Sequence, residues 1–417
     1  MAGDSSALSV PTPRIQTPRS GPIALLGYSV ETMEACDALG REFVAVVPEG
    51  FGDSLRSDGV DVIEWDFGLI NETSDRLHTK LRERGVVTSL PLFEETVEWA
   101  GALNSRFRDD PRVFNRAMLL RDKAMMKRKA QMSGIRVGVF EELDDKAAAK
   151  RFFTRIRDAL AGDDTEDPVH LKPTKAAGSV GHHAVKRVEQ IDELPDDMFP
   201  CMAESHLAGQ EFSVEAFIHN GQIQFMNINE YVHLGYCQFS PAGRALAEAR
   251  PRIEAAVRKL VRAFGIQYGI IHPEYFLDAD DELNFGEVAH RVPGGSIFEL
   301  IQRAYGFDPY AAMVLCSDPE TTPDELAYLP DPVEGRRGYA GNVLVYPQKA
   351  HIEELRIPDE LIEHPYFEKH SMFEPVTSKV ADRVGFGNHY GTIYFFGDDD
   401  AQMRQTLEHF EKVDFYV

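Results

Sequence analysis

Short apolar runs alternate with segments of helical length between residues 21 and 118. The runs are PIALLGYS, FVAVVPE, VDVIEWD and VVTSLPL, and the spacing of the first two predicts a helix over residues 30–39. Val-, Ile- and Leu-rich runs separated by helices are typical of a parallel sheet with crossover helices. We therefore expect a small Rossmann-like α/β domain. The stretch GYSVETM after the first run lacks the GxGxxG fingerprint, so this domain is not expected to bind NAD.

Residues 119–200 combine helical stretches with short strands and loops of small residues. The pattern predicts helices over 119–133, ended by Gly134, and over 144–160, with a strand over 135–140 between them. A polar loop, AGDDTEDP, then precedes two expected strands, VHLKP and HAVKRV, which flank the loop TKAAGSVGH. These elements predict a second, smaller lobe.

An antiparallel pattern occupies residues 201–316. Within EFSVEAFIHNGQIQFMNI the dipeptide Asn220-Gly221 predicts a hairpin turn. A long amphipathic helix is expected over 251–264, followed by a second hairpin over 269–288. Residues 317–417 mix short strands with helices and are expected to form a separate α+β region. Residues 1–20 are rich in Ser, Pro and Thr, and we expect them to be a flexible tail.

The composition narrows the class of protein. The chain has 417 residues with 44 Lys plus Arg against 68 Asp plus Glu, a net charge of -24 that disfavours binding to nucleic acids or anionic lipids. No run of about 18 apolar residues is present, so no membrane span is expected. The 4 cysteines form no CxxC pair, which is typical of proteins in a reducing cytoplasm. We therefore expect a cytoplasmic protein.

Two glutamates in the second expected hairpin are candidates for a metal site. With the turn centred between Asp280 and Asp281, Glu274 faces Glu287 across the two strands. Like charges opposed in this way are destabilising unless a cation lies between them, and Mg²⁺ is often held by one or two carboxylates. Two glutamates on a solvated sheet face are the alternative. The apolar residues around both positions favour a buried hairpin and hence the metal site.

Three further stretches carry candidate chemistry. Lys172 ends an apolar strand and is followed by a small-residue loop that could hold phosphates, although no Walker motif is present and glycine-rich hairpin loops are common. Arg291 and the Gly294-Gly295 pair could neutralise and approach an anion, or form a surface arginine and a simple turn. Glu204 and Glu211 offer carboxylates for an adenine edge and ribose, and solvated glutamates explain them equally well.

Taken in order, these motifs resemble those of the ATP-grasp superfamily. The motifs are Lys123 in RDKAMM, Lys172 with its loop, residues 204–207, GQEFSVE, HPEYF and FGEVAHRVPGG, and they are most similar to carboxylate-amine ligases of the L-amino acid ligase and biotin carboxylase-like branch. The resemblance covers about residues 21–310. It implies an N-terminal Rossmann-like domain (21–118), a small lobe or lid (119–200), a large lobe with the metal site (201–316) and a C-terminal α+β region (317–417).

The resemblance also implies a role for each motif. ATP would bind with one or two Mg²⁺ ions, or Mn²⁺, held by Glu274 and Glu287. Arg291 would stabilise the acyl phosphate, and the loop 292–296 would face the acceptor substrate through Gly294, Gly295 and Ser296. The residues implied around the nucleotide are Lys123, Lys172, Lys175, Gly178, Ser179, Gly181, His182, Glu204, Ser205, His206, Leu207 and Glu211. In one departure, Ala289 stands where many members have an additional Asn metal ligand.

The implied activity is ATP-dependent ligation. A carboxylate, expected to be that of an amino acid, would become an acyl phosphate and then react with an amine to give an amide, ADP and phosphate. Loading of a carrier protein, bicarbonate activation, and a non-catalytic ATP-binding regulator are the alternatives. His272 and His290 are interpreted as structural, and residues 231–242 are expected to line the substrate pocket. A homodimer acting on small molecules is the expected assembly.

Overall fold

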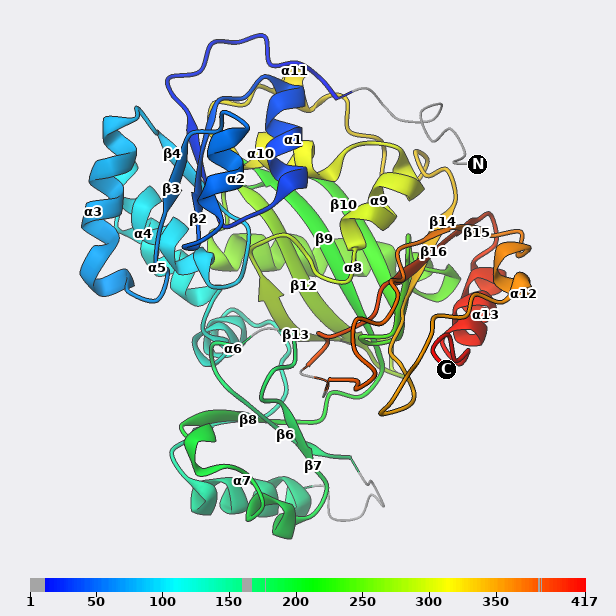
Figure 1. Cartoon of the computed structure of the whole chain (residues 1–417). Helices are drawn as coiled ribbons and strands as arrows, with labels where there is room; N and C mark the ends of the chain where they lie inside the picture. Colours follow the sequence, from blue (N-terminus) through cyan, green and yellow to red (C-terminus); the bar gives the residue numbers. More distant parts are fainter. Residues whose placement is uncertain (1–11, 160–166, 177, 382, 384) are drawn as a thin grey trace.

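The computed structural model describes residues 12–159, 167–176, 178–381, 383 and 385–417. Within these residues the named strands form three sheets, two of four strands and one of eight. Figure 1 shows the large sheet in the centre, the N-terminal domain above it on the left and the small lobe below. None of the helices in the described part of the chain is long and apolar enough to cross a membrane.

The N-terminal domain is built on a parallel sheet in the order β3-β2-β1-β4. Ser29 caps the first helix by accepting a hydrogen bond from the Thr32 amide, and Gly40 ends it with φ 71°, so the helix predicted over 30–39 is confirmed. The strands are β1 (Ile23–Leu26), β2 (Phe43–Val47), β3 (Val62–Glu64) and β4 (Thr88–Pro91), and the helices are α1 (Val30–Leu39), α2 (Gly52–Ser57), α3 (Ile70–Glu83), α4 (Thr96–Phe107) and α5 (Arg112–Leu119).

The prediction that residues 1–20 form a flexible tail is partly wrong. Residues 1–11 lie outside the described residues, but residues 12–20 pack on the protein without forming a helix or strand. Arg19 is buried and pairs with Asp318 at 3.1 Å and Glu325 at 2.7 Å. A buried arginine side chain needs such partners, and these carboxylates fix the segment beside residues 318–325.

The small lobe has an antiparallel sheet in the order β5-β8-β6-β7. Its elements are α6 (Lys123–Met132), β5 (Phe140–Leu143), α7 (Lys146–Ala159), β6 (Val169–Lys172), β7 (His183–Val185), two 3₁₀ turns (Val188–Ile191 and Asp196–Met198) and β8 (Cys201–Ser205). The lobe was expected to end at residue 200, whereas β8 pairs with β5 and β6. Residues 206–209 then lead directly to the large sheet.

Two elements of this lobe differ from the sequence prediction. The helix predicted over 119–133 begins at Lys123, because the Asp122 side chain caps its first turn. The strand predicted over 135–140 begins only at Phe140, since the Arg136 carbonyl accepts a hydrogen bond from Phe285 of the large sheet instead. Most of the predicted polar loop, residues 161–166, lies outside the described residues.

The large sheet has the order β13-β12-β9-β10-β11-β14-β16-β15. Five of its strands are β9 (Gln210–His219), β10 (Gln222–His233), β11 (Cys237–Ser240), β12 (Gly269–Leu277) and β13 (Leu283–Ala289). Asn220 and Gly221 have φ of 51° and 72°, which confirms the predicted hairpin turn. Helix α8 (Arg244–Phe264) begins well before residue 251, because Asp400 accepts a hydrogen bond from the Arg244 amide at its first turn.

The expectation of a separate C-terminal region is wrong. The elements from residue 297 on are α9 (Ile297–Tyr305), α10 (Pro309–Ser317), α11 (Pro323–Leu326), β14 (Tyr339–Leu344), α12 (Asp359–Ile362), β15 (Phe367–His370), β16 (Thr392–Gly397) and α13 (Asp400–Phe410). Strand β14 pairs with β11, with Cys237 opposite Val343, so the three strands continue the large sheet. This pairing satisfies backbone groups that β11 would otherwise expose at an edge.

Helices cover both faces of the large sheet. Val257 and Leu260 of α8 are fully buried against Ile218 on one face, while Phe298 of α9 and Met313 of α10 are buried on the other. Helix α10 also packs against α1, so the N-terminal domain and the large sheet share a core. Each buried side chain of this size stabilises the fold by about 1.5–3 kcal/mol. The strands that carry the candidate site are therefore rigidly held.

Candidate active site

The hairpin of β12 and β13 contains a β-bulge that the sequence did not reveal. His272 pairs with Ala289 in the predicted register, but Tyr275 pairs with Phe285, one residue out of that register. The register differs because the connection between the two strands, residues 278–282, is centred on Asp280. The prediction had placed its centre between Asp280 and Asp281. The extra residue on β13 falls at 286–287, opposite residue 274. Glu274 and Glu287 therefore do not form the predicted one-to-one pair, and both lie at this bulge.

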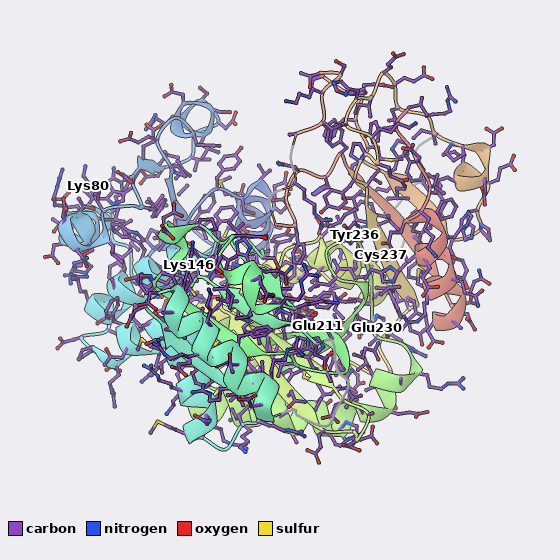
Figure 2. The ribbon with its side chains drawn as sticks, turned by 90° about the horizontal axis from the view of Figure 1, so that it is seen from below. Lys80, Lys146, Glu211, Glu230, Tyr236 and Cys237 are labelled. Atoms are coloured by element: carbon purple, nitrogen blue, oxygen red, sulfur yellow. The ribbon has the colours of Figure 1, made fainter. Side chains whose placement is uncertain are left out.

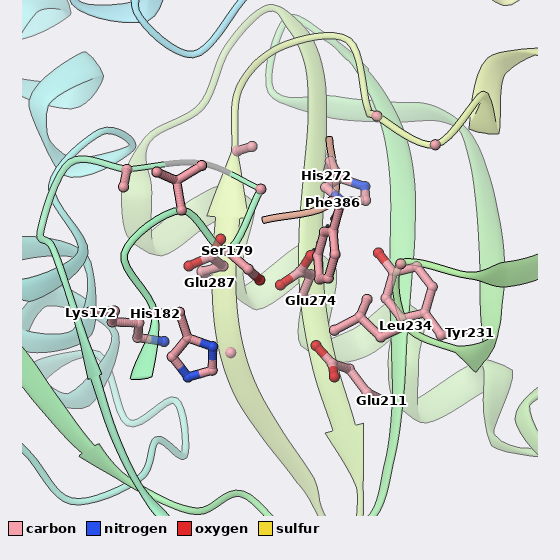
Figure 3. Close-up of a pocket in the computed structure, with 18 of the residues that line it drawn as sticks. Lys172, Ser179, His182, Glu211, Tyr231, Leu234, His272, Glu274, Glu287 and Phe386 are labelled. Carbon is pink, nitrogen blue, oxygen red and sulfur yellow. Dashed lines mark ion pairs between the residues drawn. The ribbon is translucent and has the colours of Figure 1, made fainter. Parts of the chain in front are cut away.

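Both glutamates nevertheless face the same cavity. It has a volume of about 650 Å³ and lies between the small and the large sheet. Alternate residues of β12 line it, as the two-residue period of a strand requires, whereas the bulge on β13 brings two consecutive residues to the wall. Figure 3 shows Glu274 and Glu287 there, with Glu211 beside them and Lys172 on the opposite wall. The hairpin residues on the wall are His272, Glu274, Phe276, Gly286, Glu287 and Ala289.

Most residues implied by the motifs line this cavity. They are Lys123, Lys172, Gly178, Ser179, His182, Glu204, Ser205, His206, Leu207, Glu211, Glu274, Glu287, Arg291, Gly294 and Gly295. Three do not. The Lys175 amine lies 3.5 Å from Glu98, the Ser296 hydroxyl bonds to Tyr394 at 3.1 Å, and Gly181 forms a turn beside Pro173.

Two lysines share the buried carboxylate of Glu204. The Lys172 ammonium lies 3.1 Å from one oxygen, and Lys127 contacts the other and donates to the Phe285 carbonyl at 3.0 Å. Burial opposes ionisation of Glu204, but the two lysines lower its pKa. Glu204 therefore positions Lys172, and its side chain is not free for an adenine edge. Lys127 was not singled out from the sequence, although it follows Lys123 at a spacing that places both on one face of α6.

Lys123 connects Glu287, a candidate metal ligand, to the small-residue loop that follows Lys172. Its ammonium lies 3.0 Å from Glu287 and donates to the Ala176 carbonyl at 2.8 Å. Burial alone would raise the pKa of Glu287, but Lys123 and Lys172 lower it to about 2. Glu287 is thus fully ionised at neutral pH, as a metal ligand must be.

Glu274, the second candidate metal ligand, lies beside a buried histidine. His272 lies 3.0 Å from Glu215 and 3.6 Å from Glu274. Burial disfavours its charged form, but the hydrogen bonds to both carboxylates raise its pKa to about 9. Asn227 holds Glu215 from the other side at 2.7 Å. From the sequence, His272 was interpreted as structural, and Glu215 was missed although it ends the motif GQEFSVE.

The carboxyl groups suit a divalent cation. Burial, together with Glu274 and Glu287, raises the pKa of Glu211 to about 8. Three acidic groups on one wall therefore repel each other, and oxygen ligands of this kind are those that Mg²⁺ prefers. The donor set fits Mg²⁺ even though Ala289 supplies no ligand.

Arg291 is held by a residue of the N-terminal domain. Its Nε donates to Glu94 at 2.9 Å, and its Nη1 donates to the Val292 carbonyl at 2.7 Å. Arg121 lies 3.5 Å from the other Glu94 oxygen. Glu94 follows β4 and is 8% exposed, so the pair is largely shielded from solvent. The sequence analysis does not identify Glu94 as a site residue, because no local sequence pattern links it to Arg291.

Three histidines form a row on the wall of the cavity beside residues 204–207. The His170 ring stacks on those of His182 and His206, with centroids 5.0 Å and 5.4 Å away. Its two nitrogens lie 2.9 Å and 3.1 Å from nitrogens of these neighbours. Burial and the neighbouring histidines and Lys172 lower the pKa of His170 to about 4, so it is neutral at pH 7. The row connects β6, the small-residue loop after Lys172 and residues 204–207.

The opposite end of the cavity is more apolar. Part of segment 231–242 lines it, and whether this end is the predicted substrate pocket stays a prediction. Phe386 and His389 come from a loop that the sequence analysis does not identify. Gln238 and Asn342 both donate to the Gly295 carbonyl, at 2.6 Å and 2.7 Å, and so fix the glycine loop. The residues at this end are Tyr231, Leu234, Tyr236, Gln238, Leu344, Phe386 and His389.

The chain is similar in sequence to one kind of ligase. No family model matches it. An L-arginine-specific L-amino acid ligase of Bacillus subtilis is 24% identical over 267 residues, which is 59% of this chain and 60% of that protein. The match thus spans less than two thirds of the relative's length.

Solved structures are similar over nearly the whole chain. The L-amino acid ligase from Bacillus licheniformis has a TM-score of 0.73 at 18% identity and covers 96% of this chain and 98% of its own. Carboxyaminoimidazole ribonucleotide synthase from Aspergillus clavatus, complexed with ATP, has a TM-score of 0.66 at 16% identity, over 94% and 98%. A Hydrogenobacter thermophilus biotin carboxylase domain with MgADP and bicarbonate has a TM-score of 0.64 at 14% identity, over 96% and 91%. The chain therefore has the ATP-grasp fold of the carboxylate-amine ligases, as the motifs implied.

Proposed function

We propose that this protein is an ADP-forming ligase that activates the carboxylate of an amino acid as an acyl phosphate and joins it to an amine. The observation that carries the proposal is one cavity that unites Lys123 and Lys172 with the carboxylates Glu274 and Glu287 and with Arg291. Cations suited to phosphates thus face carboxylates suited to Mg²⁺ across a space large enough for a nucleotide and a substrate.

ATP with Mg²⁺ is the proposed nucleotide. Lys123 and Lys172 would contact the phosphates, the loop with Gly178 and Ser179 would cover them, and Glu211 would bind the ribose. The backbone of residues 204–207 would hold the adenine, since the Glu204 side chain is occupied by lysines. Mg²⁺ at Glu274 and Glu287 would offset charge on the β and γ phosphates, and Mn²⁺ would serve similarly.

The reaction needs positive charge and protection from water. A carboxylate is a poor electrophile, and its attack on the γ-phosphoryl group is favoured by cations aimed at the developing charge. We assign this role to Lys172 and Arg291, with Glu94 orienting the arginine. The small lobe, including β8, would close over the cavity and exclude water that would hydrolyse the acyl phosphate. An amine then attacks the acyl carbon, and phosphate leaves.

The apolar end of the cavity favours an amino acid substrate over bicarbonate. Leu234, Tyr236 and Phe386 offer apolar surface that a substrate side chain would cover, and bicarbonate has none. A carrier protein is the second candidate for the acceptor substrate, because the cavity wall beside Gly295 would accommodate a thiol as well as an amine. We further propose that the enzyme works on small molecules as a homodimer.

The test is a screen of the purified protein with Mg-ATP and pairs of amino acids, measuring both ADP and phosphate. We expect release of both with particular pairs, and Glu287→Gln is expected to abolish it. Glu282→Gln is the matched control, because Glu282 lies in the connection of the same hairpin with its side chain 65% exposed. Equal activity of Glu287→Gln and Glu282→Gln would contradict the proposal.

A further inference from the structure

A second group of side chains that could bind a metal lies beside the apolar end of the cavity. His233 ends β10, Cys237 begins β11, and Glu411 follows the last turn of α13. One ligand atom from each lies within 4.8 Å of the others. The Cys237 thiol lies 3.2 Å from a Glu411 oxygen, and His233 Nδ1 contacts the same oxygen. Figure 2 shows Cys237 close to α13, which packs against β11.

We propose that His233, Cys237 and Glu411 bind Zn²⁺ at a structural site. Sulfur, imidazole nitrogen and carboxylate oxygen are the three ligand types that Zn²⁺ takes in proteins, in a tetrahedral arrangement. Glu408, one turn before Glu411, or a water molecule completes the fourth position. Mg²⁺ is excluded from this site because it prefers oxygen ligands alone, whereas Glu274 and Glu287 suit Mg²⁺.

The surroundings leave these groups short of positive charge. The Glu411 side chain is 17% exposed, and within the described residues it pairs with His233 rather than with a lysine or arginine. When Zn²⁺ binds, the thiol proton passes to solvent as the Zn–S bond forms, and the metal supplies the missing charge.

The site has a structural consequence for the proposed substrate pocket. The three residues between His233 and Cys237 are Leu234, Gly235 and Tyr236, and all of them line the cavity. Gly235 has φ 75°, and a Cβ there would lie 2.2 Å from the Phe386 ring. Cys237 itself also lines the cavity, so a metal that ties the two ends of this turn to α13 would fix one wall of the cavity at its edge.

The experiment is a Co²⁺ titration of the full chain after chelator treatment and dialysis, in excess Mg²⁺ to mask the carboxylate site. Tetrahedral Co²⁺ bound by a thiolate gives visible bands together with a sulfur-to-metal band in the near ultraviolet. We expect both to appear with one equivalent of Co²⁺ and to disappear when Zn²⁺ is added. Absence of the sulfur-to-metal band in the folded wild-type chain would overturn the proposal.

Variants assign the band to these ligands. Cys237→Ser is expected to lose the sulfur-to-metal band, and His233→Ala is expected to lose stoichiometric binding. Cys201→Ser and His409→Ala are the matched controls, since Cys201 is a buried cysteine of the small lobe and His409 is an exposed histidine of α13. An unchanged band in Cys237→Ser would also overturn the site. None of these readouts depends on ligase activity.

Discussion

Arg291 of the large lobe and Glu94 of the N-terminal domain form an ion pair, with 2.9 Å between Nε and Oε2. The two residues are 197 positions apart in the chain. The pair joins the end of the parallel N-terminal sheet to the hairpin that carries the candidate metal ligands. The N-terminal domain therefore contributes to the cavity directly, through the orientation of the arginine.

Glu94→Gln should impair the reaction more than it impairs nucleotide binding. The amide retains the shape of the carboxylate but loses the charge that orients the Arg291 guanidinium. Misplacement of a catalytic group by about 1 Å can lower the rate about a hundredfold, and we expect a fall in kcat of this order. Steady-state kinetics and ATP affinity measure the two effects. Glu98→Gln, on α4 of the same domain, should have little effect on either, and a similar loss in both variants would contradict the assignment.

Lys172→Ala should weaken ATP binding. Hydrogen bonds to charged groups contribute about 1.5–3 kcal/mol, so the Kd should rise about tenfold to a hundredfold. Lys175→Ala is the control, because the Lys175 amine points to Glu98 rather than into the cavity. Calorimetric titration with ATP measures both. If the Lys175 variant loses affinity for ATP and the Lys172 variant does not, then Lys175, and not Lys172, contacts the phosphates.

Lys127→Met should destabilise the fold. Lys127 and Glu204 form a buried pair, and removal of one partner costs about 3–5 kcal/mol when the other charge is left alone. Because Lys172 remains 3.1 Å from Glu204, we expect a loss at or below the low end of this range. Arg128→Met removes an exposed pair with Glu142 and should cost about 0–1 kcal/mol. Urea unfolding followed by circular dichroism gives the free energy of unfolding of each variant. Equal stability of the two variants would show that Lys127 is not needed to hold Glu204.

The pKa of His170 predicts a pH dependence of stability. Burial lowers this pKa from its ordinary value of 6.5 to about 4 in the folded protein. As the pH falls from about 6.5 towards 4, the unfolded chain binds a proton that the folded chain does not, so stability decreases. His170→Phe, which keeps a flat ring in the row, should lose less stability between about pH 7 and pH 5. Urea midpoints at the two pH values test this, and identical pH dependence of wild type and variant would refute it.

The elements predicted correctly are those whose signals are local. The helix over 30–39 carries its own cap in Ser29 and its own stop in Gly40, and Asn220-Gly221 fits the φ angles of its turn. The candidate residues were also found locally, because each motif lies on one strand or loop. Much of the cavity wall could thus be named from the sequence, with the order and spacing of the motifs as the guide.

What the sequence could not reveal depends on contacts between distant segments. The pairing of β14 with β11 places the C-terminal strands in the large sheet, and no local pattern encodes this choice of neighbour. The bulge opposite Glu274 follows from the length of the connection after Leu277. Glu94 and Phe386 reach the site from loops whose sequences carry no phosphate or metal motif.

Activation of a carboxylate by phosphoryl transfer in this cavity is the step on which the proposed function depends. The most direct measurement uses an oxygen-18-labelled carboxylate substrate from the amino acid screen, with mass spectrometry of the nucleotide and the phosphate. An acyl phosphate retains one carboxylate oxygen as the bridge to phosphorus, so amine attack leaves the label in inorganic phosphate. We expect one labelled oxygen in the phosphate and none in the ADP. Label in AMP, or unlabelled phosphate during amide formation, would contradict the account.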